Sequence, residues 1–110
     1  MDRAARLEDL IRVVRAIPEG RVASYGTVGR CLKRPLSGLL AGRMMEQVGE
    51  ACPWWRVLGA DGTLRIAAKD PRLGIIQRER LEGEGIVWTE SGPEREAYLS
   101  VDELSALTSL

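Results

Sequence analysis

Two serines, each followed by a short stretch with apolar residues at helical spacing, flank a turn that contains a proline. Ser24 stands directly before residues 25–32, and Ser37 stands before a stretch that runs from Leu39 to about Val48. Serine is a preferred helix N-cap, because its hydroxyl accepts a hydrogen bond from a free N–H of the first turn. The proline at position 35 ends the first helix. Two short helices joined in this way are the outline of a helix-turn-helix.

Three further helices are predicted around this unit. Apolar residues recur at helical spacing over residues 3–16 and 72–84, and a serine at position 100 is expected to cap a last helix over residues 100–107. Gly85 is expected to stop the second of these helices. The side chains expected to point inward from that helix are Leu73, Ile76 and Leu81.

A small β-hairpin is predicted over residues 57–64. Two short segments, Val57-Leu58 and Thr63-Leu64, flank a turn that contains Asp-Gly. Residues 65–71 are predicted to form a loop and residues 86–88 a short extended segment. A length of 110 residues allows one domain. The expected fold is therefore a single, mainly α domain with a small β-hairpin, a winged helix-turn-helix.

The chain contains no histidine. A Ser-His-Asp or Cys-His-Asn triad and a zinc site with imidazole ligands are therefore excluded. The two cysteines cannot form a structural zinc site without other ligands. We expect no metal and no cofactor. The charged start of the chain, MDRAARLEDL, has no apolar run of the kind found in signal peptides. We expect a cytoplasmic monomer with free thiols.

A search for a catalytic group finds little. Cys52 lies beside a proline in a loop and has no histidine to lower the pKa of its thiol, so a partly buried hydrophobic role is favoured. Cys31, inside a predicted helix, is expected in the core. The acidic residues of the 79–96 segment are typical of a solvated, charged face, and no pair of carboxylates stands out.

Four linked motifs carry a resemblance to a known family. Residues 17–28, IPEGRVASYGTV, resemble the segment that opens the DNA-binding domain of O(6)-alkylguanine-DNA alkyltransferases. Residues 53–57, PWWRV, are similar to that family's active-site PCHRV. The following GADGTL at 59–64 and RLEGEGI at 80–86 match two further motifs in the same order. The resemblance covers about residues 6–88, and it fades in the tail from 93 to 110.

The resemblance also shows what is missing. The positions of the alkyl-accepting cysteine and of the activating histidine are Trp54 and Trp55, and the acid of the family's relay falls near Arg78. An indole cannot replace a thiolate nucleophile. The chain therefore resembles the alkyltransferase-like proteins, the non-enzymatic branch of the family. That branch implies binding to DNA that contains O(6)-alkylguanine, flipping of the damaged base, and flagging of the lesion for nucleotide excision repair.

The family resemblance assigns roles to individual residues. It implies that the helix-turn-helix enters the minor groove, that Tyr25 favours rotation of the damaged nucleotide out of the stack, and that Leu39 occupies the position of the family's arginine finger. The expected DNA-binding and base-flipping residues are Tyr25, Arg34, Ser37, Leu39, Gly42 and Arg43. The expected lesion-pocket residues are Met45, Pro53, Trp54, Arg56, Val57 and Lys69.

Two other functions remain open at this point. The chain could be a winged-helix DNA-binding protein that has lost base flipping, a reading favoured by Leu39 in place of arginine. It could also be a transferase that uses Cys52, two residues before the usual position.

The distribution of charge along the chain favours DNA binding by its N-terminal half. The whole chain has a net charge of zero, but residues 1–56 hold 10 basic and 6 acidic side chains, and residues 57–110 hold 6 basic and 10 acidic ones. A modest set of phosphate contacts predicts a limited dependence of binding on salt.

Overall fold

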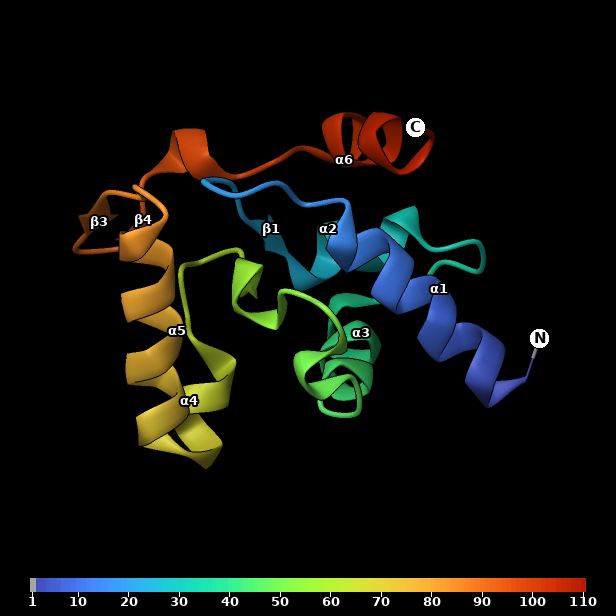
Figure 1. The fold of residues 1–110 in the computed structure, drawn as a ribbon, viewed down its shortest axis with the longest axis horizontal. Coiled ribbons are helices and arrows are strands. Elements are labelled where there is room, and N and C mark those ends of the chain that lie inside the picture. Colours follow the sequence, from blue (N-terminus) through green and yellow to red (C-terminus); the bar gives the residue numbers. More distant parts are fainter. Residues whose placement is uncertain (1) are drawn as a thin grey trace.

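The computed structural model describes residues 2–110 and is mainly helical (Figure 1). The helix-turn-helix, α2 and α3, lies at the centre, with α1 and α6 on one side and α4 and α5 on the other. The helices are α1 Arg3–Arg15, α2 Tyr25–Cys31, α3 Gly38–Met45, α4 Arg65–Lys69, α5 Pro71–Gly83 and α6 Val101–Thr108. The short 3-10 helices are η1 Gly49–Ala51, η2 Trp54–Arg56 and η3 Arg95–Ala97. The strands are β1 Ala23–Ser24, β2 Val57–Leu58, β3 Trp88–Thr89 and β4 Gly92–Pro93.

The helix-turn-helix begins as the sequence predicts. The Ser24 hydroxyl accepts from the N–H of Thr27 at 3.0 Å, and the Ser37 hydroxyl accepts from the N–H of Leu40 at 3.2 Å. Helix α3 ends at Met45, three residues earlier than predicted, and the chain continues through a turn into η1.

Gly29 allows the turn between α2 and α3 to fold back tightly. The N–H of Leu36 donates to the Gly29 carbonyl at 3.0 Å, and a Cβ on Gly29 would overlap the Leu36 carbonyl oxygen. The absence of a side chain at this position therefore sets the spacing of the two helices.

The predicted hairpin over 57–64 is wrong. Strand β2 pairs in parallel with β1, with Ala23 opposite Val57 and Ser24 opposite Leu58. The predicted turn does form, since Gly59 N–H donates to the Thr63 carbonyl at 2.9 Å, but the chain then enters α4 rather than a second strand. The antiparallel hairpin of the wing is instead β3–β4, where Trp88 lies opposite Pro93. Local turn chemistry was sufficient to predict the turn but not the strand partner.

Two other predictions on this side of the molecule need correction. Residues 65–71, predicted as a loop, contain α4 and the N-cap of α5, where the Asp70 side chain accepts from the N–H of Arg72 at 3.0 Å. Helix α5 forms as predicted and is followed by Gly85. Its inward face, however, consists of Gly74, Gln77 and Leu81, whereas Ile76 is exposed and Leu73 is half-buried.

The core consists of two clusters, and the C-terminal tail belongs to both. The larger cluster packs α1 against α2, and it includes Leu99 and Leu104 of the tail. The smaller one joins Val22, Leu58 and Leu81 and includes Ala97. The backbone of Val22 exchanges hydrogen bonds with Ala97 and Leu99 at 2.9 and 2.8 Å, and α6 begins with a capping box at Ser100. The tail therefore completes the domain. No helix in the described range 2–110 has the length and apolar character needed to cross a membrane.

Candidate nucleic-acid interface

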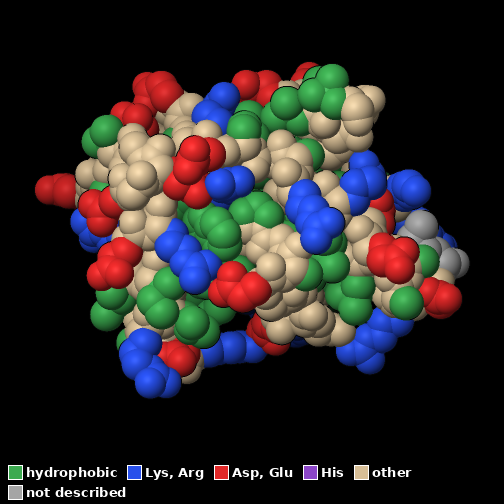
Figure 2. Space-filling model, viewed as in Figure 1, with side chains coloured by type: hydrophobic (Ala, Val, Ile, Leu, Met, Phe, Trp, Pro, Cys, Tyr) green, Lys and Arg blue, Asp and Glu red, His purple; other side chains and the backbone are tan. Residues whose placement is uncertain are grey.

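A cavity of about 400 Å³ separates α3 and η1 from α4 and α5. Figure 2 shows hydrophobic side chains gathered in this region, with basic and acidic side chains around and across the opening. The cavity walls come from α2, α3, η1, η2, α4 and α5. The lining residues are Tyr25, Gly42, Met45, Glu46, Gly49, Glu50, Trp54, Arg65, Ile66, Lys69, Leu73 and Gln77.

The pairing of β1 with β2 brings Tyr25 and Trp54 to one cavity. Tyr25 directly follows β1, and Trp54 stands three residues before β2. The Arg65 guanidinium lies 6.0 Å from the centre of the Tyr25 ring, and it packs so closely on Gly42 that a Cβ there would lie 2.5 Å from Nη1. Burial raises the pKa of Tyr25, and the nearby charge of Arg65 opposes this effect only in part. Tyr25 therefore faces the cavity as a neutral phenol.

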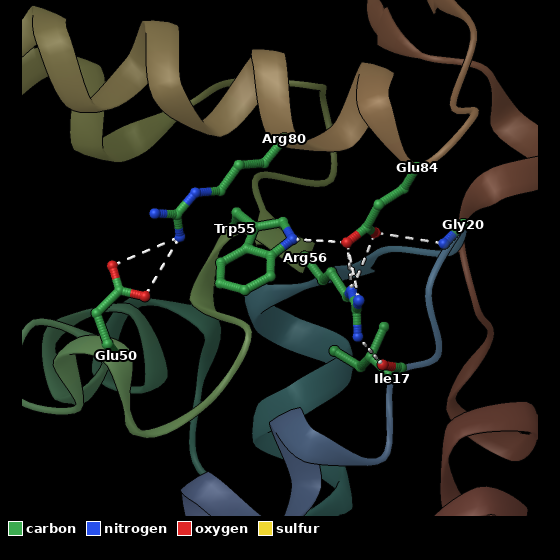
Figure 3. Close-up of polar contacts among 7 residues, drawn as sticks. All are labelled: Ile17, Gly20, Glu50, Trp55, Arg56, Arg80 and Glu84. Carbon is green, nitrogen blue, oxygen red and sulfur yellow. Dashed lines mark hydrogen bonds and ion pairs between the residues drawn. The ribbon is translucent and has the colours of Figure 1, made fainter.

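The loop that carries both tryptophans is fixed by Glu84 (Figure 3). Glu84 accepts hydrogen bonds from Trp55 Nε1 at 2.9 Å, from Arg56 Nη2 at 2.8 Å and from the Gly20 N–H at 3.3 Å. Arg56 Nη1 also donates to the carbonyl of Ile17 at 2.9 Å. Burial alone would raise the pKa of Glu84, but the hydrogen bonds and the Arg56 charge hold it below its ordinary value. This group, Trp55, Arg56 and Glu84, is called the anchor below.

Trp54 is held by exposed side chains. Its Nε1 donates to Glu50 at 3.3 Å, and Arg80 Nη1 lies 3.3 Å from the other Glu50 oxygen. The Arg80 guanidinium lies 5.6 Å from the Trp54 ring centre and 4.6 Å from that of Trp55. Figure 3 shows Arg80 reaching from α5 toward Glu50 past Trp55. The set of Trp54, Glu50 and Arg80 is called the clasp below.

A second ion pair spans the same cavity. Lys69, at the end of α4, pairs with Glu46, the C-cap residue of α3, and this hydrogen bond lowers the pKa of Glu46. Both carboxylates of the α3–η1 side, Glu46 and Glu50, are therefore paired with cations from the α4–α5 side.

Gln77 is a cavity residue that sequence reasoning missed. It is buried on the inner face of α5, and its Nε2 donates to the carbonyls of Trp55 at 3.1 Å and Val57 at 3.0 Å. Its Oε1 has no hydrogen-bond partner within the part of the chain that the structure describes. The sequence did contain a signal for it. Gln77 lies three residues after Gly74 and four before Leu81, so it is a polar residue on the buried side of the helix.

The structure brings part of the predicted lesion pocket together. Met45, Trp54 and Lys69 line the cavity, as do Tyr25 and Gly42 from the predicted DNA-binding set. Pro53, Arg56 and Val57 do not. Arg56 is used by the anchor, and Val57 is buried in β2 with its carbonyl bonded to Gln77. These three residues do not line the cavity because neighbouring residues in a loop point in several directions, and their contact with a lesion stays a prediction.

The remaining predicted DNA-binding residues lie on the outer face of the helix-turn-helix. Leu39 is 55% exposed, unusually so for a leucine at the start of a helix. Arg34, Ser37 and Arg43 are also exposed, and neither arginine has an ion-pair partner within residues 2–110. This face therefore offers free positive charge around an apolar side chain.

Arg78, near which the family resemblance places the relay acid, does not line the cavity. Arg78 lies 4.9 Å from the ring centre of Trp88 and pairs with Glu82, away from the cavity. The α5 side chains at the tryptophan loop are Gln77 and Arg80, with Glu84 just beyond the helix end. The acid that contacts Trp55 is therefore Glu84, which the Arg56 charge and its hydrogen bonds keep ionised.

Cys52 has none of the features of a nucleophile. The residue is buried, and burial raises the pKa of its thiol to about 11. A neutral, buried thiol is a poor nucleophile, since the thiolate is the reactive form. Within residues 2–110 no group of three His, Cys, Asp or Glu side chains is placed to hold a metal ion.

Comparison with known proteins identifies the family to which this chain is similar. Residues 7–86 match the family described as 6-O-methylguanine DNA methyltransferase, DNA binding domain. The chain is 32% identical over 83 residues to the DNA base-flipping protein of Escherichia coli, covering 74% of this chain and 62% of that protein's length. It is 33% identical over 75 residues to Alkyltransferase-like protein 1 of Schizosaccharomyces pombe, covering 64% and 66% of the two chains.

Solved structures agree with the sequence comparison. The crystal structure of S. pombe Atl1 in complex with damaged DNA containing O6-carboxymethylguanine superimposes with a TM-score of 0.69 at 27% identity. The match covers 91% of this chain and 99% of the other. A second crystal structure of the S. pombe protein with DNA gives a TM-score of 0.68 at 28% identity.

Proposed function

The chain belongs to the family of 6-O-methylguanine DNA methyltransferase DNA-binding domains, among its alkyltransferase-like members, and we propose that it recognises O(6)-alkylguanine in duplex DNA without removing the alkyl group. The observation that carries this proposal is the cavity beside the helix-turn-helix. Tyr25 and Trp54 line this cavity, and Trp54 is the residue that the family resemblance matches to the alkyl-accepting cysteine.

DNA binding rests on the outer face of α2 and α3. In the sequence, exposed Arg34 and Arg43 lie on either side of Ser37, Leu39 and Leu40, which are exposed as well. Free guanidinium groups contact phosphates. This arrangement suits entry of α3 into the minor groove, as the family resemblance implies.

Base flipping is assigned to Tyr25 and Leu39. The phenol lies at the cavity edge and displaces the nucleotide that rotates out of the stack. The exposed Leu39 side chain fills the vacated space, as apolar wedges do in proteins that unstack DNA from the minor groove. Flipping costs a few kcal/mol, and a lesion that weakens base pairing lowers this cost.

The flipped base enters the cavity, where Trp54 and Met45 supply an aromatic and an apolar wall and Lys69 supplies a positive charge. No alkyl transfer follows. The chain has no histidine, and the nearest thiol, Cys52, is buried with a raised pKa. We propose that the bound complex marks the lesion for nucleotide excision proteins.

A second candidate function is a winged-helix DNA-binding protein that has lost base flipping. Leu39 favours this candidate, because an aliphatic side chain cannot hydrogen-bond the orphaned cytosine as an arginine can.

Competition binding separates the two candidates. A short duplex with one O(6)-methylguanine competes against the same duplex with guanine, for the parent protein and for Tyr25→Phe and Tyr25→Ala. The parent is expected to prefer the lesion, and Tyr25→Ala is expected to lose most of this preference. Equal affinity of the parent for both duplexes would favour the second candidate and reject lesion recognition. A mass increase on Cys52 after incubation with alkylated DNA would contradict the absence of transfer.

A substitution at the wedge position tests the role of Leu39. Leu39→Arg is expected to bind the lesion duplex about tenfold more tightly, since it adds a hydrogen bond to the orphaned base and a charge near phosphate. Because Leu39 is exposed, the fold should be unaffected. Weaker binding than the parent in the same titration would count against the assigned position.

A further inference from the structure

The two neighbouring tryptophans of the loop are held in different ways. Trp55 belongs to the anchor, in which the side chains of Arg56 and Glu84 are only 15% and 9% exposed. Trp54 belongs to the clasp, in which those of Arg80 and Glu50 are 39% and 68% exposed. Of the two, only Trp54 lines the cavity. The wall that would meet an alkyl group is therefore attached by the weaker set of contacts.

The clasp crosses from one side of the cavity to the other. Glu50 lies in η1, on the α3 side, and Arg80 lies on α5. Trp54 contacts both, through its Nε1 to the Glu50 carboxylate and through its ring face to the Arg80 guanidinium. Arg80 itself does not line the cavity. A movement of the indole away from Glu50 or Arg80 would break one of these contacts.

We propose that the Arg80–Glu50 clasp positions Trp54 as an adjustable wall and thereby sets the size of the O(6) substituent that the cavity accepts. The inference rests on the proposed function, and it assigns Arg80 and Glu50 as positioning residues. A small substituent fits with the clasp closed. A bulky one requires Trp54 to move outward, at the expense of the ion pair and the Arg80 stack. The anchor keeps the backbone of the loop fixed while Trp54 moves.

Binding of two lesions of different size tests whether Trp54 acts as an adjustable wall. The parent, Arg80→Met and Glu50→Gln are titrated with the same duplex carrying O(6)-methylguanine, O(6)-benzylguanine or guanine. Methionine keeps an apolar stem against the indoles and removes the charge. In both variants the ratio of Kd for the benzyl duplex to Kd for the methyl duplex is expected to fall by about threefold, a size typical of an exposed ion pair. General phosphate attraction cancels in this ratio, because the duplexes carry equal charge.

The chain offers a matched control. Arg78 is on the same helix, stacks on Trp88 at 4.9 Å and pairs with Glu82, but is away from the cavity. Arg78→Met therefore removes the same kind of contact without touching the wall. The benzyl-to-methyl ratio of this variant is expected to equal that of the parent. A fall as large as that of Arg80→Met would overturn the inference.

Acrylamide quenching of tryptophan fluorescence tests the clasp without DNA. The contribution of Trp54 is isolated by subtraction of the Trp54→Phe variant, since Trp55 and Trp88 also emit. Quenching of Trp54 is expected to increase in Arg80→Met and Glu50→Gln but not in Arg78→Met. Unchanged quenching would show that the clasp does not hold the indole and would overturn the inference.

The failures of the two proposals are distinguishable. A parent protein that binds all three duplexes equally would reject lesion recognition and this inference with it. A parent that prefers lesions, together with an unchanged ratio in both clasp variants, would reject the adjustable wall alone.

Discussion

Trp54 and Trp55 are adjacent in sequence and identical in chemistry, yet they belong to different environments. Trp55 donates to the Glu84 carboxylate, which also accepts from Arg56 and from the Gly20 N–H, and Arg56 donates in turn to the Ile17 carbonyl. Trp54 donates to a carboxylate on the surface. In the 3-10 turn that they share, one indole is directed to the protein and the other to the cavity.

This difference assigns stability to one of two adjacent residues and recognition to the other. The anchor joins the tryptophan loop to the end of α5 and to the turn after α1, so its loss affects the whole domain. The clasp joins side chains that remain in contact with water, where an ion pair has little effect on folding. Variants at the two sites should therefore differ in which property they change.

The largest effect is expected at the centre of the anchor. Glu84→Gln leaves the Arg56 guanidinium enclosed without a counter-charge, and loss of one partner of a buried pair is strongly destabilising. The free energy of unfolding is expected to fall by about 3 kcal/mol, measured by urea denaturation followed by circular dichroism. Glu82→Gln, which breaks the exposed pair with Arg78, is the matched control and should leave the midpoint unchanged. Equal effects of the two substitutions would show that the anchor is no stronger than a surface pair.

Alanine substitution of each tryptophan compares the two sites directly. Trp55→Ala removes an indole packed against the smaller core cluster and is expected to cost about 2 kcal/mol of unfolding free energy. Trp54→Ala is expected to cost less than half as much but to reduce discrimination between lesion and unmodified duplexes. Denaturation and competition binding are measured on the same preparations. If Trp54→Ala were the more destabilising and Trp55→Ala the more damaging to recognition, the assignment of the two sites would be reversed.

The smallest effect is a dependence of stability on pH. Burial raises the pKa of Glu84, but its hydrogen bonds and the Arg56 charge hold the net value below the ordinary 4.5, so the unfolded chain binds this proton more tightly. The stabilisation by the anchor is therefore complete above pH 4.5 and is lost as the pH falls through the lowered pKa of the folded protein.

Denaturation over a range of pH checks this expectation. The difference in unfolding free energy between the parent and Glu84→Gln should stay constant from pH 7 down to about pH 5 and narrow below that. The hydrogen bonds of Trp54 and Arg80 also lower the pKa of Glu50, but the curve for Glu50→Gln should deviate less from that of the parent, because solvent screens the exposed clasp. A constant difference down to pH 3 would show that Glu84 does not titrate with unfolding.

The sequence predicted the elements that depend on local chemistry. The serine caps at positions 24, 37 and 100 and the tight turn between α2 and α3 were found, because a cap is satisfied by residues three positions away. The hairpin assigned to 57–64 was wrong, because strand pairing is decided by distant segments. Val57 and Leu58 found their partners at Ala23 and Ser24, more than 30 residues earlier.

The residues of the candidate site were likewise predicted only in part from the sequence. The motif around positions 53–57 identified the loop, but not which of its side chains enter the cavity. Arg65 and Glu50 carried no signal of their own, since each gains its place only when α4 and α5 face α3 and η1 across the cavity. The tail from 93 to 110 also had no assigned role. Its role is seen only in the folded protein, where its apolar residues pack in the core with α1 and its backbone bonds to Val22.

The sequence by itself determined the helix-turn-helix, the family and the absence of a histidine-activated cysteine, because these depend on residue identity and short spacings. Only the tertiary structure decided that Trp55 belongs to the anchor and that Trp54 lines the cavity. Two indoles in one turn have the same local preferences, and their roles differ because one meets a buried carboxylate and the other an exposed one.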